Sequence, residues 1–153
     1  MLRETKKWKL GRPAVKITML HHVSIVTSDL GRSAGFYRDV LGLPALPRPP
    51  FAIGGAWFAL GPDEIHLVVN SDGTFPRKSA IDRNDTHFAI RVENFDEAVS
   101  DLMAKGFRED AAEDDPMRLI VSRNSAAGYP QAYLLDPDRH VIEINAAADK
   151  QKR

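Results

Sequence analysis

The first regular pattern in the chain is an alternation of apolar and polar side chains in LHHVSIVT, residues 20–27. It predicts a half-buried strand with one apolar side and His22 on the other side. Apolar residues at helical spacing follow and predict a helix over residues 29–41, with Ser28 as its N-cap. After a Pro-rich stretch, AWFAL and EIHLVV predict two short strands joined by the turn-like GPD.

The same order of elements returns after a polar stretch that is punctuated by Gly and Pro. THFAIRV predicts a strand, and NFDEAVSDLMAKG predicts a helix in which Asn94 and Glu97 have the spacing of a capping box. RLIVS, QAYLL and HVIEINA predict three more strands. Placing His22 over His87 aligns the two halves, so the pattern predicts an α+β fold with two tandem βαβββ modules.

The domain organisation follows from this repeat. We expect a flexible basic tail (1–16), a first βαβββ module (17–70), a connector (71–85), a second βαβββ module (86–147) and a short tail (148–153). The first tail is rich in Lys and Arg, which is typical of a solvated terminal segment.

Composition narrows the function classes. The chain has 153 residues with 21 basic and 21 acidic side chains, and this balance argues against nonspecific binding to nucleic acid or to an anionic membrane. The sequence contains no run of about 20 apolar residues that would cross a bilayer and nothing typical of a signal peptide, so we expect a soluble, cytoplasmic protein. The absence of cysteine excludes disulfides, thiolate metal sites and a cysteine nucleophile.

Four residues with metal-binding side chains occupy equivalent places in the two halves. They are His22 and His87 in the first strand of each half, and His66 and Glu143 in the last. Their strand neighbours are almost all apolar, so alternation predicts that the four project together from a concave face opposite the helices. Imidazole and carboxylate groups are ligands for zinc, nickel, cobalt, manganese or iron(II). Whether His66 is a ligand stays open, because three ligands already form a facial site with open positions.

Other residues are candidates for catalysis or substrate contact. Glu143 is a candidate general base if it leaves the metal, and a bound hydroxide is the alternative. The aromatic side chains of Phe51, Trp57, Phe58 and Tyr133 are candidates to line an apolar pocket. Arg91 and Arg118 are candidates to hold a substrate anion, and His140, in the turn DPDRH, to touch substrate.

Four segments carry a resemblance to a known family. LHHVSIVTSDLGRSAGFYRDVLG, IHLV, HFAIRV and LLDPDRHVIEIN resemble the glyoxalase / bleomycin-resistance / dioxygenase group, the vicinal oxygen chelate superfamily. The resemblance covers roughly residues 19–147. The resemblance implies a glyoxalase-like fold, in which paired βαβββ modules form a cup-shaped mixed sheet around one divalent metal ion. It also implies a homodimer whose sites can borrow ligands from both chains. The family's ligand positions fall on His22, His66, His87 and Glu143.

Two departures from the family pattern affect the interpretation. Glyoxalase I enzymes commonly have a carboxylate, which takes part in moving the substrate proton, where this sequence has His66. The usual Asp-Pro-Asp-Gly-Asn turn also differs, because Arg139 and His140 replace its last two residues. Extradiol dioxygenases use two histidines and one glutamate, and His66 would fill a position that oxygen or substrate needs.

The resemblance implies a metal-dependent lyase or isomerase, similar to lactoylglutathione lyase-like proteins. Such an enzyme would act on a small oxygen-rich substrate that is chelated through adjacent oxygens. The alternatives are an extradiol-type dioxygenase or another metal enzyme of the superfamily, or a non-enzymatic binder that sequesters a small molecule. In each case the expected partners are a small molecule and a second copy of the chain.

Overall fold

The computed structural model describes residues 16–148, and the predicted tails lie almost entirely outside this range. The first half consists of β1 (His22–Thr27), α1 (Leu30–Gly35), the π-helical turn η1 (Phe36–Val40), β2 (Ala45–Leu46), β3 (Gly55–Leu60) and β4 (Asp63–Val69). The second half consists of β5 (His87–Arg91), α2 (Phe95–Ala104), β6 (Ile120–Ser122), β7 (Gln131–Leu135) and β8 (Val141–Asn145). This order confirms the predicted α+β fold of two βαβββ modules.

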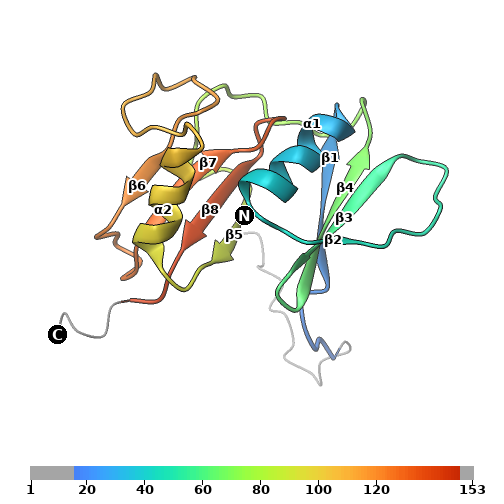
Figure 1. Cartoon of the computed structure of the whole chain (residues 1–153), viewed down its shortest axis with the longest axis horizontal. Helices are drawn as coiled ribbons and strands as arrows, with labels where there is room; N and C mark the ends of the chain where they lie inside the picture. The colour runs from blue at the N-terminus through green and yellow to red at the C-terminus, as the bar shows by residue number, and fades with distance from the viewer. Residues whose placement is uncertain (1–15, 149–153) are drawn as a thin grey trace, which may run out of the picture.

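Each module forms its own four-stranded mixed sheet, with strand order β1-β4-β3-β2 in the first and β5-β8-β7-β6 in the second. In both sheets the first strand runs parallel to the last, which is in turn antiparallel to the strand before it. The helix α1 lies between the two sheets, and α2 lies over the second (Figure 1). A single chain therefore contains two separate sheets, one from each module.

The start of the first helix differs from the sequence-based expectation. Asp29, and not Ser28, is the N-cap, because its side chain accepts a hydrogen bond from the backbone N–H of Arg32 at 3.0 Å. Ser28 instead donates its hydroxyl hydrogen bond to Asp138 in the other module. The predicted helix is also divided into α1 and η1. The second helix begins as predicted, with Asn94 accepting from the backbone of Glu97 at 3.2 Å.

The apolar core is continuous across both modules. One cluster of buried side chains includes Tyr37, Phe58 and Leu67 from the first half together with Leu134 and Ile142 from the second. Contacts of this kind follow from strand alternation, since the apolar face of each sheet turns toward the helices. Within the described range, no helix is both long enough and apolar enough to traverse a bilayer.

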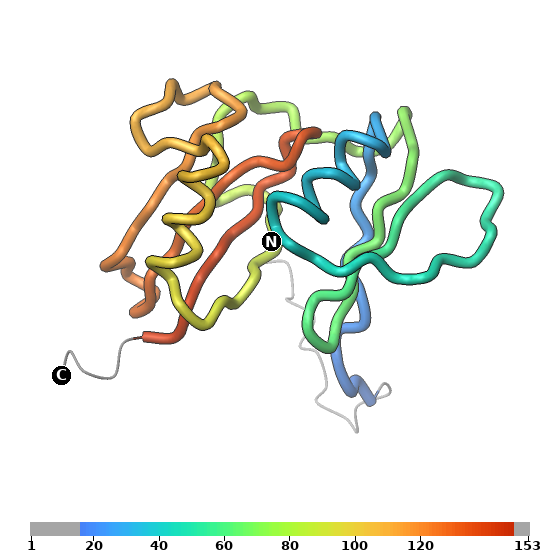
Figure 2. Tube along the Cα trace, viewed as in Figure 1, coloured from blue at the N-terminus to red at the C-terminus, as the bar shows by residue number. Residues whose placement is uncertain are grey.

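A polar contact also joins the modules, between the β7–β8 turn and the beginning of α1. Asp138 accepts hydrogen bonds from the hydroxyl of Thr27 at 2.8 Å, the backbone N–H of Ser28 at 3.1 Å and the hydroxyl of Ser33 at 3.3 Å. The hydroxyl of Tyr37 donates to Asp136 at 3.0 Å. We call this set of six residues the module joint. Figure 2 shows the turn beside the start of α1, and the connector that leads to β5 passing the same end of the molecule.

Burial and hydrogen bonding set the charge states in the module joint. Burial raises the pKa of Asp136, which is 3% exposed. Burial and the neighbouring Asp136 also raise the pKa of the Tyr37 phenol, which keeps its proton available for donation. Burial alone would raise the pKa of Asp138, but the hydrogen bonds from Ser28, Thr27 and Ser33 lower it overall. Asp138 is therefore held as an ionised acceptor.

Removing the Tyr37 hydroxyl is expected to destabilise the chain. Tyr37→Phe keeps the fully buried ring but leaves Asp136 without this donor. A buried acceptor that loses its partner costs about 1–3 kcal/mol, so the free energy of unfolding measured with urea should fall by this amount. Tyr129→Phe is the matched control, because the Tyr129 ring lies against Arg91 outside the module joint. Equal stabilities of the two variants would contradict a stabilising role for the Tyr37 hydroxyl.

Candidate metal centre

The first sheet brings His22 and His66 together on one face. His22 is on β1 and His66 on the parallel neighbour β4, and their rings stack with centroids 4.1 Å apart and an interplanar angle of 13°. Trp57, directly opposite His66 on β3, stacks on His66 at 4.2 Å. His66 is therefore held between two rings and is only 8% exposed.

A carboxylate that the sequence analysis missed completes this cluster. Glu64 lies two residues before His66 on β4, and its Oε2 is 2.6 Å from Nε2 of His66. This hydrogen bond is the main cause that lowers the pKa of Glu64. The sequence indicates that Glu64 lies beside His66, because residues i and i+2 of a strand project from the same face. His21, which alternation assigns to the other face, lies with its Nδ1 2.8 Å from Nδ1 of His22.

The second sheet brings His87 and Glu143 together. His87 is on β5 and Glu143 on the parallel neighbour β8, and Nε2 of His87 lies 3.5 Å from Oε2 of Glu143. Glu143 is 4% exposed, so its charge needs donors from the protein. Tyr133 donates to Oε2 at 2.9 Å, while the side-chain amides of Gln131 and Asn145 donate to Oε1 at 3.1 and 2.7 Å.

These hydrogen bonds control the ionisation of Glu143. Burial alone would raise its pKa, but the donors on Asn145, Gln131 and Tyr133, together with the charge of His87, lower it overall. In return, burial and the Glu143 carboxylate raise the pKa of the Tyr133 phenol to about 12. Glu143 is thus ionised and fixed in orientation, while Tyr133 remains a donor.

The donor set suits a divalent metal ion. Two ligands bound at about 2.1 Å in tetrahedral geometry lie about 3.4 Å from each other, close to the 3.5 Å between the His87 and Glu143 donor atoms. However, no group of three or more His, Cys, Asp and Glu side chains within residues 16–148 is arranged to hold a metal ion. The four candidate ligands instead lie in two separate pairs, His22 with His66 and His87 with Glu143, and we call each pair a half-site.

The predicted aromatic side chains have different surroundings. Trp57 lies on the same face as His66, and the exposed ring of Phe51 is 6.0 Å from it. Phe58 does not line this face, and the prediction for it is wrong. It is 2% exposed and packs against Tyr37 in the core, because adjacent residues of a strand point to opposite faces.

The two predicted arginines have different surroundings. Arg91 follows His87 on the same face of β5, and its guanidinium lies 5.1 Å from the centre of the Tyr129 ring. Arg118 instead donates to the backbone carbonyls of Glu109 and Ala111, the latter at 2.6 Å. These two hydrogen bonds hold the loop, and the assignment of Arg118 to a substrate anion stays a prediction.

His140 also has a structural contact that the sequence did not indicate. Its Nε2 lies 3.0 Å from the backbone carbonyl of Val26, so it donates across the boundary between the two modules. Its ring centroid is 6.1 Å from that of Phe75 in the connector. His140 therefore supports the arrangement of the modules rather than either half-site.

Comparison with known proteins assigns the family. Residues 19–144 match the family model described as the Glyoxalase/Bleomycin resistance protein/Dioxygenase superfamily. The chain belongs to this superfamily. The resemblance read from the sequence motifs is thereby confirmed. The superfamily includes metal-dependent enzymes with different substrates and members that bind a divalent metal ion.

Curated relatives within the superfamily are only moderately similar. The chain is 32% identical over 108 residues to the mitochondrial methylmalonyl-CoA epimerase of Mus musculus. The aligned region covers 66% of the chain and 57% of the relative. It is 26% identical over 136 residues to the metallothiol transferase FosB of Staphylococcus saprophyticus, covering 84% of the chain and 77% of the relative. The matched region thus spans little more than half the length of the epimerase.

Solved structures share the fold at lower identity. A glyoxalase family protein from Bacillus anthracis has a TM-score of 0.68 at 22% identity, covering 86% of this chain and 97% of that protein. Lactoylglutathione lyase from Agrobacterium tumefaciens has a TM-score of 0.61 at 19% identity, covering 86% and 96%. At these identities the comparison supports the glyoxalase-like fold alone.

Asn145→Ala is expected to raise the pKa of Glu143, because the variant lacks the 2.7 Å hydrogen bond to its carboxylate. A ¹³C NMR titration of the Glu143 carboxylate, assigned with Glu143→Gln, measures this change. A carboxylate with a lowered pKa stabilises the fold above the usual glutamate value of about 4.3, and the contribution is lost as pH falls through the folded-state pKa. The difference in the free energy of unfolding between wild type and variant should therefore be largest at neutral pH and should disappear in acid.

The control for this titration is Asn124→Ala, which removes an exposed asparagine in the β6–β7 loop. Its Glu143 carboxylate should titrate as in the wild type. An Asn145→Ala variant whose Glu143 also titrates as in the wild type would show that Asn145 does not control this carboxylate.

Proposed function

We propose that this chain is a metal-dependent lyase or isomerase that transfers a proton next to a carbonyl group of a small substrate. The observation that carries the proposal is the His87–Glu143 pair, in which three donors keep a buried carboxylate ionised beside an imidazole. A second carboxylate, Glu64, lies at the other half-site against His66. Carboxylates in both half-sites suit a reaction that removes a proton and returns it.

The residues that would hold the metal ion are His22, His66, His87 and Glu143. Their nitrogen and oxygen donors suit zinc, nickel, iron(II), manganese or cobalt. When bound, such an ion would stabilise the negative charge that develops on two adjacent substrate oxygens. To bind through Nε2, His66 has to exchange its contact with Glu64 for one with the metal, which frees the Glu64 carboxylate.

We further propose that each complete site forms between two copies of the chain. One chain holds two separate half-sites, and a two-fold axis could bring the first half-site of one copy to the second half-site of the other. Large apolar side chains are exposed beside the first half-site, namely Ile17 (85%), Met19 (53%) and Leu20 (61%) before β1 and Phe51 and Ile53 before β3. Side chains of this kind favour burial against a partner.

The protein's own side chains then have distinct tasks. If Glu143 leaves the metal, it accepts the proton on a carboxylate oxygen, and the hydrogen bonds from Gln131, Tyr133 and Asn145 keep it oriented for that transfer. Glu64 is placed to hold or return a proton on the opposite side of the substrate. Trp57 and Phe51 provide the apolar wall that excludes water. A reducing compartment such as the cytoplasm suits this cysteine-free chain.

Proton transfer is favoured over ring cleavage because it uses a carboxylate at each half-site. The similarity to an enzyme named as an epimerase supports the same class of reaction. Oxygen uptake with catechols would instead support the extradiol-type alternative. Sequestration of a small molecule without turnover would support a binding protein.

Metal binding is expected to need both half-sites. His87→Ala and Glu143→Ala should lose stoichiometric metal after reconstitution, because each removes one of the two donors that lie 3.5 Å apart. Elemental analysis of the purified protein measures this loss. Glu97→Ala, which removes an exposed carboxylate from α2, is the control and should bind as the wild type does. Full occupancy in both site variants would refute the ligand assignment.

Mixing two inactive variants distinguishes shared sites from sites within one chain. The double variants His22→Ala/His66→Ala and His87→Ala/Glu143→Ala are unfolded together and refolded. Shared sites should restore about a quarter of the wild-type metal content, because about half of the dimers are mixed and each mixed dimer holds one intact site of two. Metal content that stays at zero in confirmed mixed dimers would contradict sharing.

The reaction class is tested by exchange of substrate protons with solvent. The metal-loaded chain is incubated in D₂O with methylmalonyl-CoA or with the hemithioacetal of methylglyoxal and glutathione, and deuterium incorporation is followed by NMR. Glu143→Gln should lower the exchange rate per bound metal ion at least about 100-fold, since it removes the general base. Stereoselective exchange without oxygen uptake supports the proposal, and oxygen-dependent turnover of a catechol in its place would overturn it.

A further inference from the structure

A pocket of about 350 Å³ lies between the connector and the β7–β8 turn. Its walls come from residues 74–86 of the connector and from residues 139–141, and we call it the connector pocket. Phe75, Pro76 and Val141 contribute apolar surface, and arginine side chains contribute positive charge. Neither half-site of the candidate metal centre is part of it.

The charged side chains of the connector pocket leave two guanidinium groups without a carboxylate partner. Lys78 forms an ion pair with Asp82. Arg139 donates to the backbone carbonyls of Ser79 at 2.5 Å and Asp114 at 3.3 Å, which carry no net charge. Within residues 16–148, no hydrogen bond or ion pair involves the exposed side chain of Arg77.

The formal charge of the lining is accordingly positive. Arg77, Lys78 and Arg139 outnumber Asp82 and Asp85, which gives +1 before any charge on His140 is counted. A guanidinium group presents several N–H donors in a planar fork that matches a carboxylate or a phosphate. The connector pocket therefore has the chemistry for an oxyanion.

The backbone at Arg139 shows that this wall of the pocket is specifically built. Arg139 has a φ of 69°, and it is the one non-glycine residue with positive φ among residues 16–148. Glycine adopts this conformation freely, whereas a side chain at this position is strained. The two hydrogen bonds of the guanidinium hold the turn against the connector and against the loop that contains Asp114.

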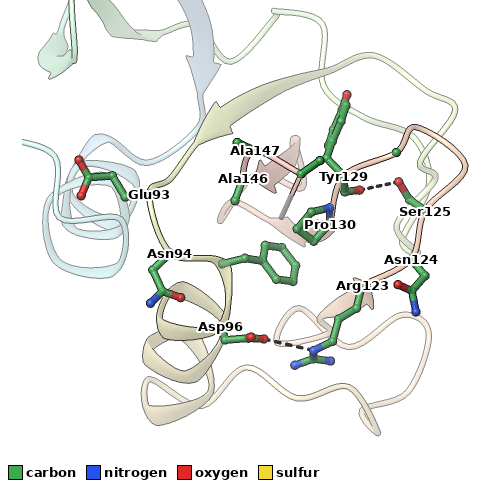
Figure 3. A pocket seen from close by; sticks show the side chains of 13 residues that line it. Glu93, Asn94, Asp96, Arg123, Asn124, Ser125, Tyr129, Pro130, Ala146 and Ala147 are labelled. Carbon is green, nitrogen blue, oxygen red and sulfur yellow. Dashed lines mark hydrogen bonds and ion pairs between the residues drawn. The ribbon is translucent and has the colours of Figure 1, made fainter. Parts of the chain in front are cut away.

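The larger hollow at the other end of the second sheet differs in charge. It has a volume of about 890 Å³ and lies between the start of α2 and the β6–β7 loop (Figure 3). Its arginine, Arg123, is already paired with Asp96 at 3.2 Å, and Glu93 adds a second acidic group. Its lining has a formal charge of −1, so of these two hollows only the connector pocket favours an anion.

The connector pocket lies on the side of the second sheet that carries the candidate metal centre. Val141 projects from the same face as Glu143, two residues away on β8, which corresponds to about 7 Å along a strand. It is also the register partner of His87 on β5. The wall of the pocket at Val141 therefore adjoins the strand positions that carry Glu143 and His87.

We propose that the connector pocket binds a carboxylate or phosphate group of the substrate. The direct partners are the guanidinium of Arg77 and that of Arg139, and Phe75 and Val141 contact the carbon chain that joins the two ends of the substrate. The assignment of this anion to the substrate rests on the proposed function. The binding of an oxyanion in the pocket does not depend on the proposed function.

The pocket is tested first on the metal-free full chain with inorganic phosphate. In ¹H–¹⁵N NMR spectra, saturable shifts are expected for residues 74–86 and 139–141. Arg77→Gln should weaken the Kd about tenfold or more, because a charge-assisted hydrogen bond is lost. Arg123→Gln, in the acidic hollow, should leave the Kd unchanged. Absent or non-saturable shifts, shifts confined to other segments, or an unchanged Kd in Arg77→Gln would overturn the proposal.

The second measurement separates a substrate group from free phosphate. The metal-loaded chain is titrated with 3-phosphoglycerate and with glycerate, which share adjacent carboxylate and hydroxyl oxygens and differ in the phosphate. The phosphate should tighten the Kd about tenfold or more, and Arg77→Gln should remove this difference. Equal affinities would overturn the assignment to the substrate. A chain that binds no metal fails the proposed function, while the phosphate titration still decides whether the pocket binds an oxyanion.

Discussion

The carboxylates of the β7–β8 turn hold the two modules in one arrangement. Asp138 accepts hydrogen bonds from the end of β1 and from α1, and Asp136 is buried beneath the hydroxyl of Tyr37. Buried carboxylates lose their water and need protein donors in its place, so moving the turn away from α1 would take donors from both carboxylates. This requirement keeps α1 between the two sheets and makes one apolar core out of two modules.

The same arrangement explains why one chain holds two half-sites. Each sheet pairs ligands on its own parallel strands, His22 with His66 and His87 with Glu143. With α1 between the sheets, the two faces do not form one closed cup within the chain. In the proposed dimer, the second copy supplies the missing half, so that metal binding, assembly and activity depend on one another.

The β7–β8 turn also links module arrangement to substrate recognition. Asp138 belongs to the module joint, while the adjacent Arg139 forms a wall of the connector pocket, and His140 contacts both the backbone of β1 and the connector. In the proposed enzyme, a substrate anion in the pocket would therefore rest on the segment that fixes the two modules. The replacement of the family's usual Gly-Asn by Arg139 and His140 accounts for these added contacts.

The sequence by itself determined the two βαβββ modules, the family and the face from which each ligand projects, because alternation in a strand is a local property that the order of residues encodes. The same alternation places Trp57 and Phe58 on opposite faces and Glu64 on the face of His66. The tertiary structure alone decided which groups meet across the modules. Asp138 lies 110 residues from Ser28 and His140 lies 114 residues from Val26, so no local pattern encodes either contact.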